Sequence, residues 1–215
     1  MSTAPFAELL AQRAQQASLI LAPPLTSALE AYFQLLRRWN RKINLTGLDL
    51  DAVTGEGVDR LFIEPLVAAR HVTPGTARII DLGSGGGSPA IPLTLAVPSA
   101  SVTMVESRSK KSVFLLEAAR ELSVAARVLT ARYEDLLDRS DLLEAFDTLT
   151  SRALRLGSHE VALVQTFVRA GGRLILFRST GRQEQELAVN SPLARFSTQS
   201  LPRVDTELVI LQKDA

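Results

Sequence analysis

The sequence predicts an α/β fold built on a mostly parallel sheet, with helices at the N-terminus and an antiparallel hairpin at the C-terminus. From Ala77 onward, short apolar runs alternate with helical segments, which is typical of parallel strands joined by right-handed crossovers. The first apolar run ends in a turn with glycine at four of the five positions from 83 to 87. Near the C-terminus, two strand-like runs with only a short link predict a hairpin added to the parallel sheet.

The composition is that of an ordinary globular protein with one substantial core. The 215 residues are 46% hydrophobic and 22% charged, and the formal net charge of +1 predicts no strong electrostatic steering. The absence of cysteine excludes disulfides and thiol nucleophiles. Only two histidines exist, His71 and His159, and they are far apart, so we expect no metal site. No apolar run reaches the roughly 18 residues of a membrane span and no signal-peptide pattern is present, so we expect a cytoplasmic protein without a membrane partner.

Three helices are predicted before the first strand. The first covers residues 5–21, the second follows Thr26 as its expected N-cap, and the third covers about 58–72. The second helix carries an apolar stripe at three- and four-residue steps, which predicts a face turned to the core. The stripe consists of Leu29, Tyr32, Phe33, Leu36, Trp39 and Ile43.

The rest of the chain contains the alternating strands and helices. The predicted strands cover 78–82, 101–106, 127–131, 147–151 and 173–178, followed by the hairpin strands 196–201 and 206–213. The helices between them cover about 89–97, 110–122, 139–145 and 158–170. We expect residues 1–75 to form a helical extension packed on the core, and residues 76–215 to form the domain that contains the sheet.

The glycine-rich turn after the first strand predicts a nucleotide-type site. Glycines allow a backbone with positive φ and close approach to a ligand, and the turn begins at Gly83. We expect Ser88 to cap a helix whose first turn contains Pro89. Bare N–H groups and a positive helix end then favour a bound nucleotide. The alternative is an ordinary tight turn between a strand and a helix.

The kind of nucleotide follows from the residues around this turn. The segment Gly83-Ser-Gly85-Gly-Gly-Ser88 lacks the third glycine of a dinucleotide fingerprint. The carboxylate of Asp81, expected at the mouth of the pocket, would repel a pyrophosphate but attract a cationic group. These features favour S-adenosylmethionine (SAM), which carries an ammonium group and a sulfonium.

Further candidate residues follow the other strands. Glu106 ends the second strand, where an acidic residue can bind ribose hydroxyls, although a capping or surface glutamate is the alternative. Tyr133 and Glu134 follow the third strand and could flank an adenine ring, or belong to a plain surface loop. Arg152 follows the fourth strand and could face the substrate; alternatively it pairs with Asp147 or Glu160.

Basic side chains gather at two places, and we expect them to contact RNA. One group follows the second and fifth strands; the other ends the second helix, where a solvated face that favours the helix dipole is the alternative. These residues are Arg108, Lys110, Lys111 and Arg178 in the first group and Arg38, Arg41 and Lys42 in the second. Trp39 lies on the apolar stripe, so we expect it in the core.

Four segments together resemble the RsmG (formerly GidB) family, in matching order and spacing over about residues 25–213. They are Trp39-Asn-Arg-Lys-Ile-Asn-Leu-Thr46, Asp81-Leu-Gly-Ser-Gly-Gly-Gly-Ser-Pro89, Lys110-Lys111 and Thr150-Ser-Arg-Ala153. The resemblance implies a class I SAM-dependent methyltransferase with a Rossmann-like fold, which methylates N7 of one guanine in the 16S rRNA of the small ribosomal subunit.

The resemblance also implies roles for individual residues. The SAM-contacting positions fall on Gly83, Ser88, Tyr133, Glu134 and Arg152, to which the reading of the residues adds Asp81, Gly85 and Glu106. Asn44 and Lys110 fall on positions associated with the active-site and RNA-facing side, and we expect these two residues and Arg152 to be catalytic. The sequence departs from the family pattern at Leu61, Ser88 and Ala90.

Two other functions remain open from the sequence. One is a catalytically inactive SAM- or RNA-binding ribosome-assembly factor, suggested by the departures from the family pattern. The other is a nicotinamide-dependent oxidoreductase, which the missing third glycine and the short chain after the fold disfavour. We expect a monomer.

Overall fold

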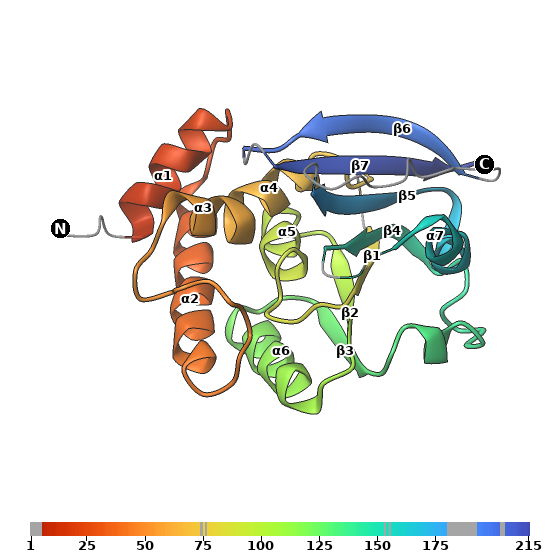
Figure 1. Cartoon of the computed structure of the whole chain (residues 1–215), viewed down its shortest axis with the longest axis horizontal. Coiled ribbons are helices and arrows are strands. Elements are labelled where there is room, and N and C mark those ends of the chain that lie inside the picture. The colour runs from red at the N-terminus through yellow and green to blue at the C-terminus, as the bar shows by residue number, and fades with distance from the viewer. Residues whose placement is uncertain are drawn as a thin grey trace.

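The computed structural model describes residues 6–73, 75, 77–152, 154, 156–179, 193–202 and 205–215. These residues form a seven-stranded sheet with the order β3-β2-β1-β4-β5-β7-β6 (Figure 1). The strands are β1 (Arg78–Leu82), β2 (Ser101–Glu106), β3 (Ala126–Thr130), β4 (Phe146–Ser151), β5 (Val168–Ser179), β6 (Leu193–Ser200) and β7 (Thr206–Lys213).

The sheet is parallel except at its C-terminal edge. β1 lies between β2 and β4 and is parallel to both, and β3 and β5 extend the sheet in the same direction. β7 is antiparallel to β5 and to β6. The predicted α/β fold with a C-terminal antiparallel hairpin is therefore confirmed. The strand order reverses beside β1, and such a point is where open α/β sheets bind ligands.

Helices cover both faces of the sheet. They are α1 (Phe6–Gln16), α2 (Pro23–Asn40), α3 (Gly55–Val58), α4 (Glu64–Ala69), α5 (Ala90–Ala96), α6 (Ser109–Glu121) and α7 (Ser158–Val164), with a π-helical turn η1 (Asp59–Ile63) and the 3₁₀ turns η2 (Glu134–Leu136) and η3 (Gln165–Phe167). Figure 1 shows α2, α5 and α6 side by side on one side of the sheet and α7 on the other. No helix of these described segments is long and apolar enough to cross a membrane.

Alternation along the strands divides the core between the two faces. Ile79 packs with the N-terminal helices, α5 and α6, whereas its neighbour Ile80 packs with α7. Phe6, Phe33 and Phe62 stack or meet edge to face within the first of these clusters. Successive strand residues point to opposite faces of the sheet, so the two clusters lie on different faces. The N-terminal helices belong to the first cluster and therefore share a hydrophobic core with one face of the sheet.

Several predicted helix boundaries at the N-terminus are wrong. α1 ends at Gln16 instead of residue 21, because Ser18 adopts a positive φ of 53° and closes the helix. α2 begins at Pro23, so Thr26 lies inside it and does not cap it; its hydroxyl donates to the Ala22 carbonyl. Proline is tolerated at a first helical position because its missing N–H has no partner to lose there.

Three further helix predictions need correction. The single helix expected over 58–72 is divided into the end of α3, the π turn η1 and α4. Residues 139–145 form turns, in which Glu144 has a positive φ of 49°. The helix expected over 158–170 ends as α7 at Val164, since Val168 already pairs with Phe146 of β4 and starts β5.

Candidate functional site

A cavity of about 560 Å³ lies at the carboxyl ends of the central strands. Its walls come from the glycine-rich turn after β1, the residues after β2 and β3, and Arg152 after β4. The N-terminal region contributes Leu36 of α2, the segment from Leu45 to Gly47, and Arg60 and Leu61 of η1. The predicted nucleotide turn therefore lines a cavity at the predicted edge of the sheet.

The glycine-rich turn has a backbone that other residues would strain. Gly83 and Gly87 adopt φ values of +76° and +89°, and a Cβ at Gly87 would lie 2.5 Å from Ile91 Cδ1. Tyr32 of α2 stabilises the turn, because its hydroxyl donates a 2.6 Å hydrogen bond to the Gly86 carbonyl. Burial raises the pKa of Tyr32, so the phenol stays protonated as a donor.

Glu106 at the end of β2 connects the turn to the next loop. Its Oε2 accepts a 2.9 Å hydrogen bond from the Gly85 N–H, and its Oε1 accepts a 2.8 Å hydrogen bond from the Arg108 N–H. The carboxylate is buried and lines the cavity. Two backbone donors fix its orientation, and each oxygen keeps acceptor capacity for a ligand hydroxyl.

Asp81 does not lie where the sequence suggested. It is buried and is not among the residues that line the cavity, so the expected position at the pocket mouth is wrong. Its Oδ1 accepts a 2.6 Å hydrogen bond from Thr150 Oγ1, and its Oδ2 has no hydrogen-bond partner among the described residues. Burial raises the pKa of Asp81 to about 6.

Arg152 is the cation in the cavity wall. Its Nη1 lies 3.0 Å from Oε2 of Glu64 and also donates to the Arg60 carbonyl. Its guanidinium carbon lies 4.2 Å from the centre of the Phe177 ring. Nε and Nη2 are buried without a hydrogen-bond partner in the described part of the chain. Burial lowers the pKa of Arg152 to about 10, and the Glu64 carboxylate opposes this shift.

The alternative partners considered for Arg152 are occupied elsewhere. Asp147 accepts hydrogen bonds from the Arg169 side chain and from the Arg78 N–H. Glu160 accepts from the Gly157 N–H at the start of α7. Arg152 instead pairs with Glu64 and is one of the residues that line the cavity.

The other predicted cofactor residues also border the cavity. Tyr133 and Glu134 line it on the side of β3, and Gly83, Gly85 and Ser88 line it around the turn. Ser88 does not cap α5 as expected: the N-cap position is Pro89, and the Ser88 hydroxyl donates to the Leu61 carbonyl at 3.0 Å.

The predicted active-site and RNA-facing residues divide into two groups. Arg108 and Lys111 line the cavity, on the side where α6 begins. Lys110 and Asn44 are exposed and do not line it, although Leu45 and Thr46 beside Asn44 do. Asn40 shapes this segment, because its side chain accepts hydrogen bonds from the N–H groups of Leu45 and Thr46.

The basic end of α2 forms a separate surface hollow lined by Gln34, Arg37, Arg38, Arg41 and Lys42. Arg38 lies within 3.4 Å of Glu117 and 3.3 Å of Glu121, and Arg41 lies 2.6 Å from Asp51. Exposed pairs of this kind are weak and can exchange for phosphates.

Two predicted residues lie away from this hollow and from the cavity. Trp39 is half-buried and donates from Nε1 to Glu117 at 2.8 Å, so it belongs to the edge of the core. Arg178 lies on β5, two residues beyond the residue that pairs with Ser151 at the end of β4, and does not line the cavity.

The sequence analysis missed Glu64, Arg60 and Tyr32. Glu64 carried a signal, because it is the one charge in the apolar run from Leu61 to Ala69 and a buried charge needs a partner. Tyr32 and Arg60 carried none, since a tyrosine on an apolar stripe and a single arginine are common in any helix.

The cavity suits binding and orientation better than acid–base or metal chemistry. It brings together a glycine turn, a carboxylate with fixed orientation and a cation with unpaired donors. Among the described residues, no group of three or more acidic or histidine side chains is placed to hold a metal ion.

Comparisons with known proteins agree with this geometry. Residues 25–207 match the family model described as "rRNA small subunit methyltransferase G". A ribosomal RNA small subunit methyltransferase G of Cupriavidus necator is 30% identical over 216 residues, covering 93% of this chain and 91% of the relative. One from Stenotrophomonas maltophilia is 37% identical over 168 residues, covering 77% and 72%. A SAM-dependent methyltransferase from Aquifex aeolicus has the same fold, with a TM-score of 0.55 and 11% identity over 72% of this chain and 91% of that one.

Proposed function

The chain belongs to the rRNA small subunit methyltransferase G (GidB) family, and we propose that it methylates N7 of one guanine in 16S rRNA, with SAM as the methyl donor. It is thus a SAM-dependent rRNA methyltransferase. The observation that supports the proposal most is the single cavity wall shared by the glycine turn, Glu106 and Arg152. All three stand at the edge of the sheet where this fold binds its cofactor.

The residues around the cavity fit SAM part by part. Tyr133 stands on the β3 side, where it can flank an adenine ring, and Glu106 at the end of β2 can accept from ribose hydroxyls. The unpaired Nε and Nη2 of Arg152 match the methionyl carboxylate, because an arginine fork binds a carboxylate through two parallel hydrogen bonds. Asp81 does not line the cavity, but its buried carboxylate, two residues before Gly83, would add a negative potential that favours a cationic ligand when it is ionised.

The reaction asks little acid–base chemistry of the protein. SAM, when bound, supplies an electrophilic methyl group. Guanine N7 carries a lone pair and no proton, so its attack needs no general base. The chain would therefore contribute orientation and electrostatics, with the glycine turn, Glu106 and Arg152 holding the cofactor. The absence of cysteine excludes the covalent route of cytosine C5 methylation.

The basic side chains at the cavity are suited to the rRNA backbone. Arg108 and Lys111 line the cavity on the α6 side, and the exposed Lys110 lies beside them. We infer that these three contact phosphates near the target base, and that Asn44 faces the RNA. Arg38, Arg41, Lys42 and Arg178 would add outer contacts, the first two by exchanging carboxylates for phosphates.

The two parts of the chain would contribute differently to this function. We infer that residues 1–75 act as a helical extension and residues 76–215 as the methyltransferase domain. The extension contributes Leu36, Leu45 and Arg60 to the cavity, so it would complete the site. The substrate implies a protein that works in the cytoplasm, and we propose that it acts as a monomer.

Measurements of cofactor binding and methyl transfer distinguish this function from the two alternatives. A titration with SAM should saturate, whereas NAD and NADP should not bind at comparable concentrations. Saturable binding of a nicotinamide cofactor without SAM binding would support an oxidoreductase instead. SAM binding without methyl transfer to small subunits would support an inactive assembly factor. Ser88 and Leu61, at two positions that depart from the family pattern, contact each other in the cavity wall and would then be the residues to revert.

A further inference from the structure

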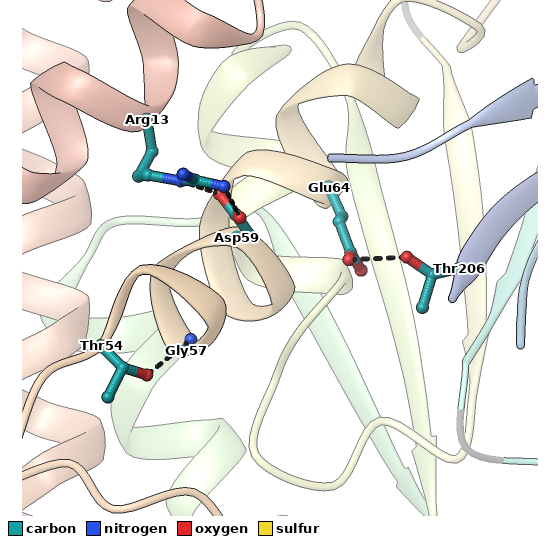
Figure 2. A network of polar contacts seen from close by, with 6 residues as sticks. All are labelled: Arg13, Thr54, Gly57, Asp59, Glu64 and Thr206. Carbon is teal, nitrogen blue, oxygen red and sulfur yellow. Dashed lines mark hydrogen bonds and ion pairs between the residues drawn. The ribbon is translucent and has the colours of Figure 1, made fainter. Parts of the chain in front are cut away.

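Glu64 is a buried carboxylate that no predicted role accounts for. It is 1% exposed, and it contacts two residues that are distant in the sequence. Its Oε2 lies 3.0 Å from Nη1 of Arg152, and its Oε1 accepts a 3.1 Å hydrogen bond from Thr206 Oγ1 of β7 (Figure 2). A charge buried in this way is unfavourable unless it is paired, so its position is dictated by what it pairs with.

The contacts of Arg152 define which edge of its guanidinium is free. A guanidinium has five N–H bonds in a plane. Nη1 uses its two on Glu64 and on the Arg60 carbonyl, and Phe177 covers one face of the group at 4.2 Å. The three N–H bonds of Nε and Nη2 have no partner among the described residues. Glu64 therefore holds the Nη1 side of the group, and the Nε–Nη2 edge is left buried without a protein partner among the described residues.

The turn that carries Glu64 is itself held from both sides. On its outer side, Asp59 pairs with Arg13 of α1 (Figure 2), with a 2.8 Å hydrogen bond from Nε. On its inner side, the Arg60 carbonyl accepts from Arg152 and Glu64 pairs with it. The Glu64 N–H bonds to the Asp59 carbonyl, which closes the π turn η1 between these two residues.

We propose that Glu64 is a positioning residue, which orients Arg152 to bind the methionyl carboxylate of SAM. The turn from Asp59 to Glu64, which the ion pair between Arg13 and Asp59 anchors to α1, fixes the position of Glu64. The inference rests on the proposed function, because it takes SAM as the ligand of the cavity. It predicts that Glu64 affects the binding of the methionyl end of the cofactor and not that of the adenosine end.

Two ligands that differ only at that end provide the test. S-adenosylhomocysteine carries the amino-acid carboxylate, and 5′-methylthioadenosine is an adenosine thioether without it. We expect Glu64→Gln to raise the Kd of S-adenosylhomocysteine about tenfold or more, the range of a charge-assisted hydrogen bond. The Kd of 5′-methylthioadenosine should change by less than about twofold, since its groups lie away from Arg152.

The matched control removes the other contact of Glu64. Thr206→Val deletes the hydroxyl that donates to Oε1 and leaves the pairing of Oε2 with Arg152. It should leave both Kd values unchanged. The variant Glu64→Asp keeps the negative charge but shortens the side chain by one methylene, which moves the carboxylate away from Arg152. It should also raise the Kd of S-adenosylhomocysteine selectively, by a smaller factor than Glu64→Gln does. It therefore provides the same comparison if Glu64→Gln does not fold.

The possible outcomes separate cleanly. Equal weakening of both ligands, in Glu64→Gln or in Glu64→Asp, would show that Glu64 only supports the fold and would overturn the proposal. Unchanged binding of both ligands in a folded Glu64→Gln would also overturn it. If the unmodified protein bound neither ligand, the proposed function itself would fail, which the wild-type titration reveals before any variant is measured.

Discussion

The Gly85 N–H donates a 2.9 Å hydrogen bond to Oε2 of Glu106, which ties the turn after β1 to the end of β2. The second oxygen of the same carboxylate accepts from the Arg108 N–H at the start of the next loop. One buried side chain therefore sets the spacing of two loops that border the cavity. Such fixed polar groups are what a cofactor site needs before the ligand arrives.

This relationship predicts the effect of neutralising Glu106. Glu106→Gln keeps the size but replaces one acceptor oxygen with an NH₂ group, which faces a backbone donor or a ribose hydroxyl. We expect the Kd for SAM to rise about tenfold to a hundredfold, as for the loss of a charge-assisted hydrogen bond. Isothermal titration calorimetry measures this directly. Glu121→Gln, on the exposed side of α6, is the control, and equal Kd values for the two variants would contradict the role of Glu106.

The Arg13–Asp59 pair predicts a large effect on stability from a residue that does not line the cavity. Asp59 is 2% exposed, so Arg13→Met leaves a buried carboxylate without its cation. We expect the free energy of unfolding to fall by about 3 kcal/mol, because an uncompensated buried charge is strongly unfavourable. Urea denaturation provides the measurement.

The control for this pair is an arginine that also binds an aspartate through two nitrogens. Arg139 contacts Asp141 at 2.9 and 2.6 Å, but both side chains are exposed. Arg139→Met should lower the free energy of unfolding by less than about 1 kcal/mol. A similar loss of the free energy of unfolding in the two variants would mean that the burial of Asp59 does not determine how much its pair with Arg13 stabilises the protein.

Asp81 predicts a pH dependence of stability. Burial raises its pKa to about 6 in the folded protein, against an ordinary value of 3.8. Between these values the folded protein binds a proton that the unfolded chain has lost, so stability falls as the pH rises from about 4 to about 6. Above that window the ionised carboxylate lowers stability by about 3 kcal/mol in total.

The variant Asp81→Asn removes this titration and keeps an acceptor for the Thr150 hydroxyl. We expect its free energy of unfolding to lack the decline between pH 4 and 6 that the unmodified protein shows, as measured by urea denaturation across that range. The difference between the two proteins should therefore be larger at pH 7 than at pH 4. Parallel pH profiles would indicate that Asp81 titrates with an ordinary pKa.

Much of the fold follows from local patterns in the sequence. The apolar residues of the first strand, Ile79, Ile80 and Leu82, are all buried, as expected for a strand covered on both faces. The glycine turn predicted the edge of the sheet where the cavity lies, and the positive φ values of Gly83 and Gly87 explain why glycine is needed there. These signals are local, and the structure confirms both the sheet and the cavity beside the turn.

The rest depends on contacts between distant parts of the chain. Arg152 pairs with Glu64, 88 positions earlier, and no spacing rule connects the two. Helix propensity continues through residues 58–72, but the structure has a π turn there, between the buried and paired carboxylates of Asp59 and Glu64. Ser88 resembles a helix cap in sequence, yet its hydroxyl donates to the carbonyl of Leu61, its neighbour in the cavity wall. Tertiary partners of this kind override local preference.

The most direct test of the proposed function is methyl transfer from labelled SAM to small ribosomal subunits that lack the modification, followed by mapping of the labelled base. We expect one label per subunit, on a single guanine, at a position that becomes sensitive to the strand cleavage specific for N7-methylguanine. Unmodified subunits from the same preparation, incubated without the protein, are the control. Label on another atom or another base, or no label despite saturable SAM binding, would contradict the proposed reaction.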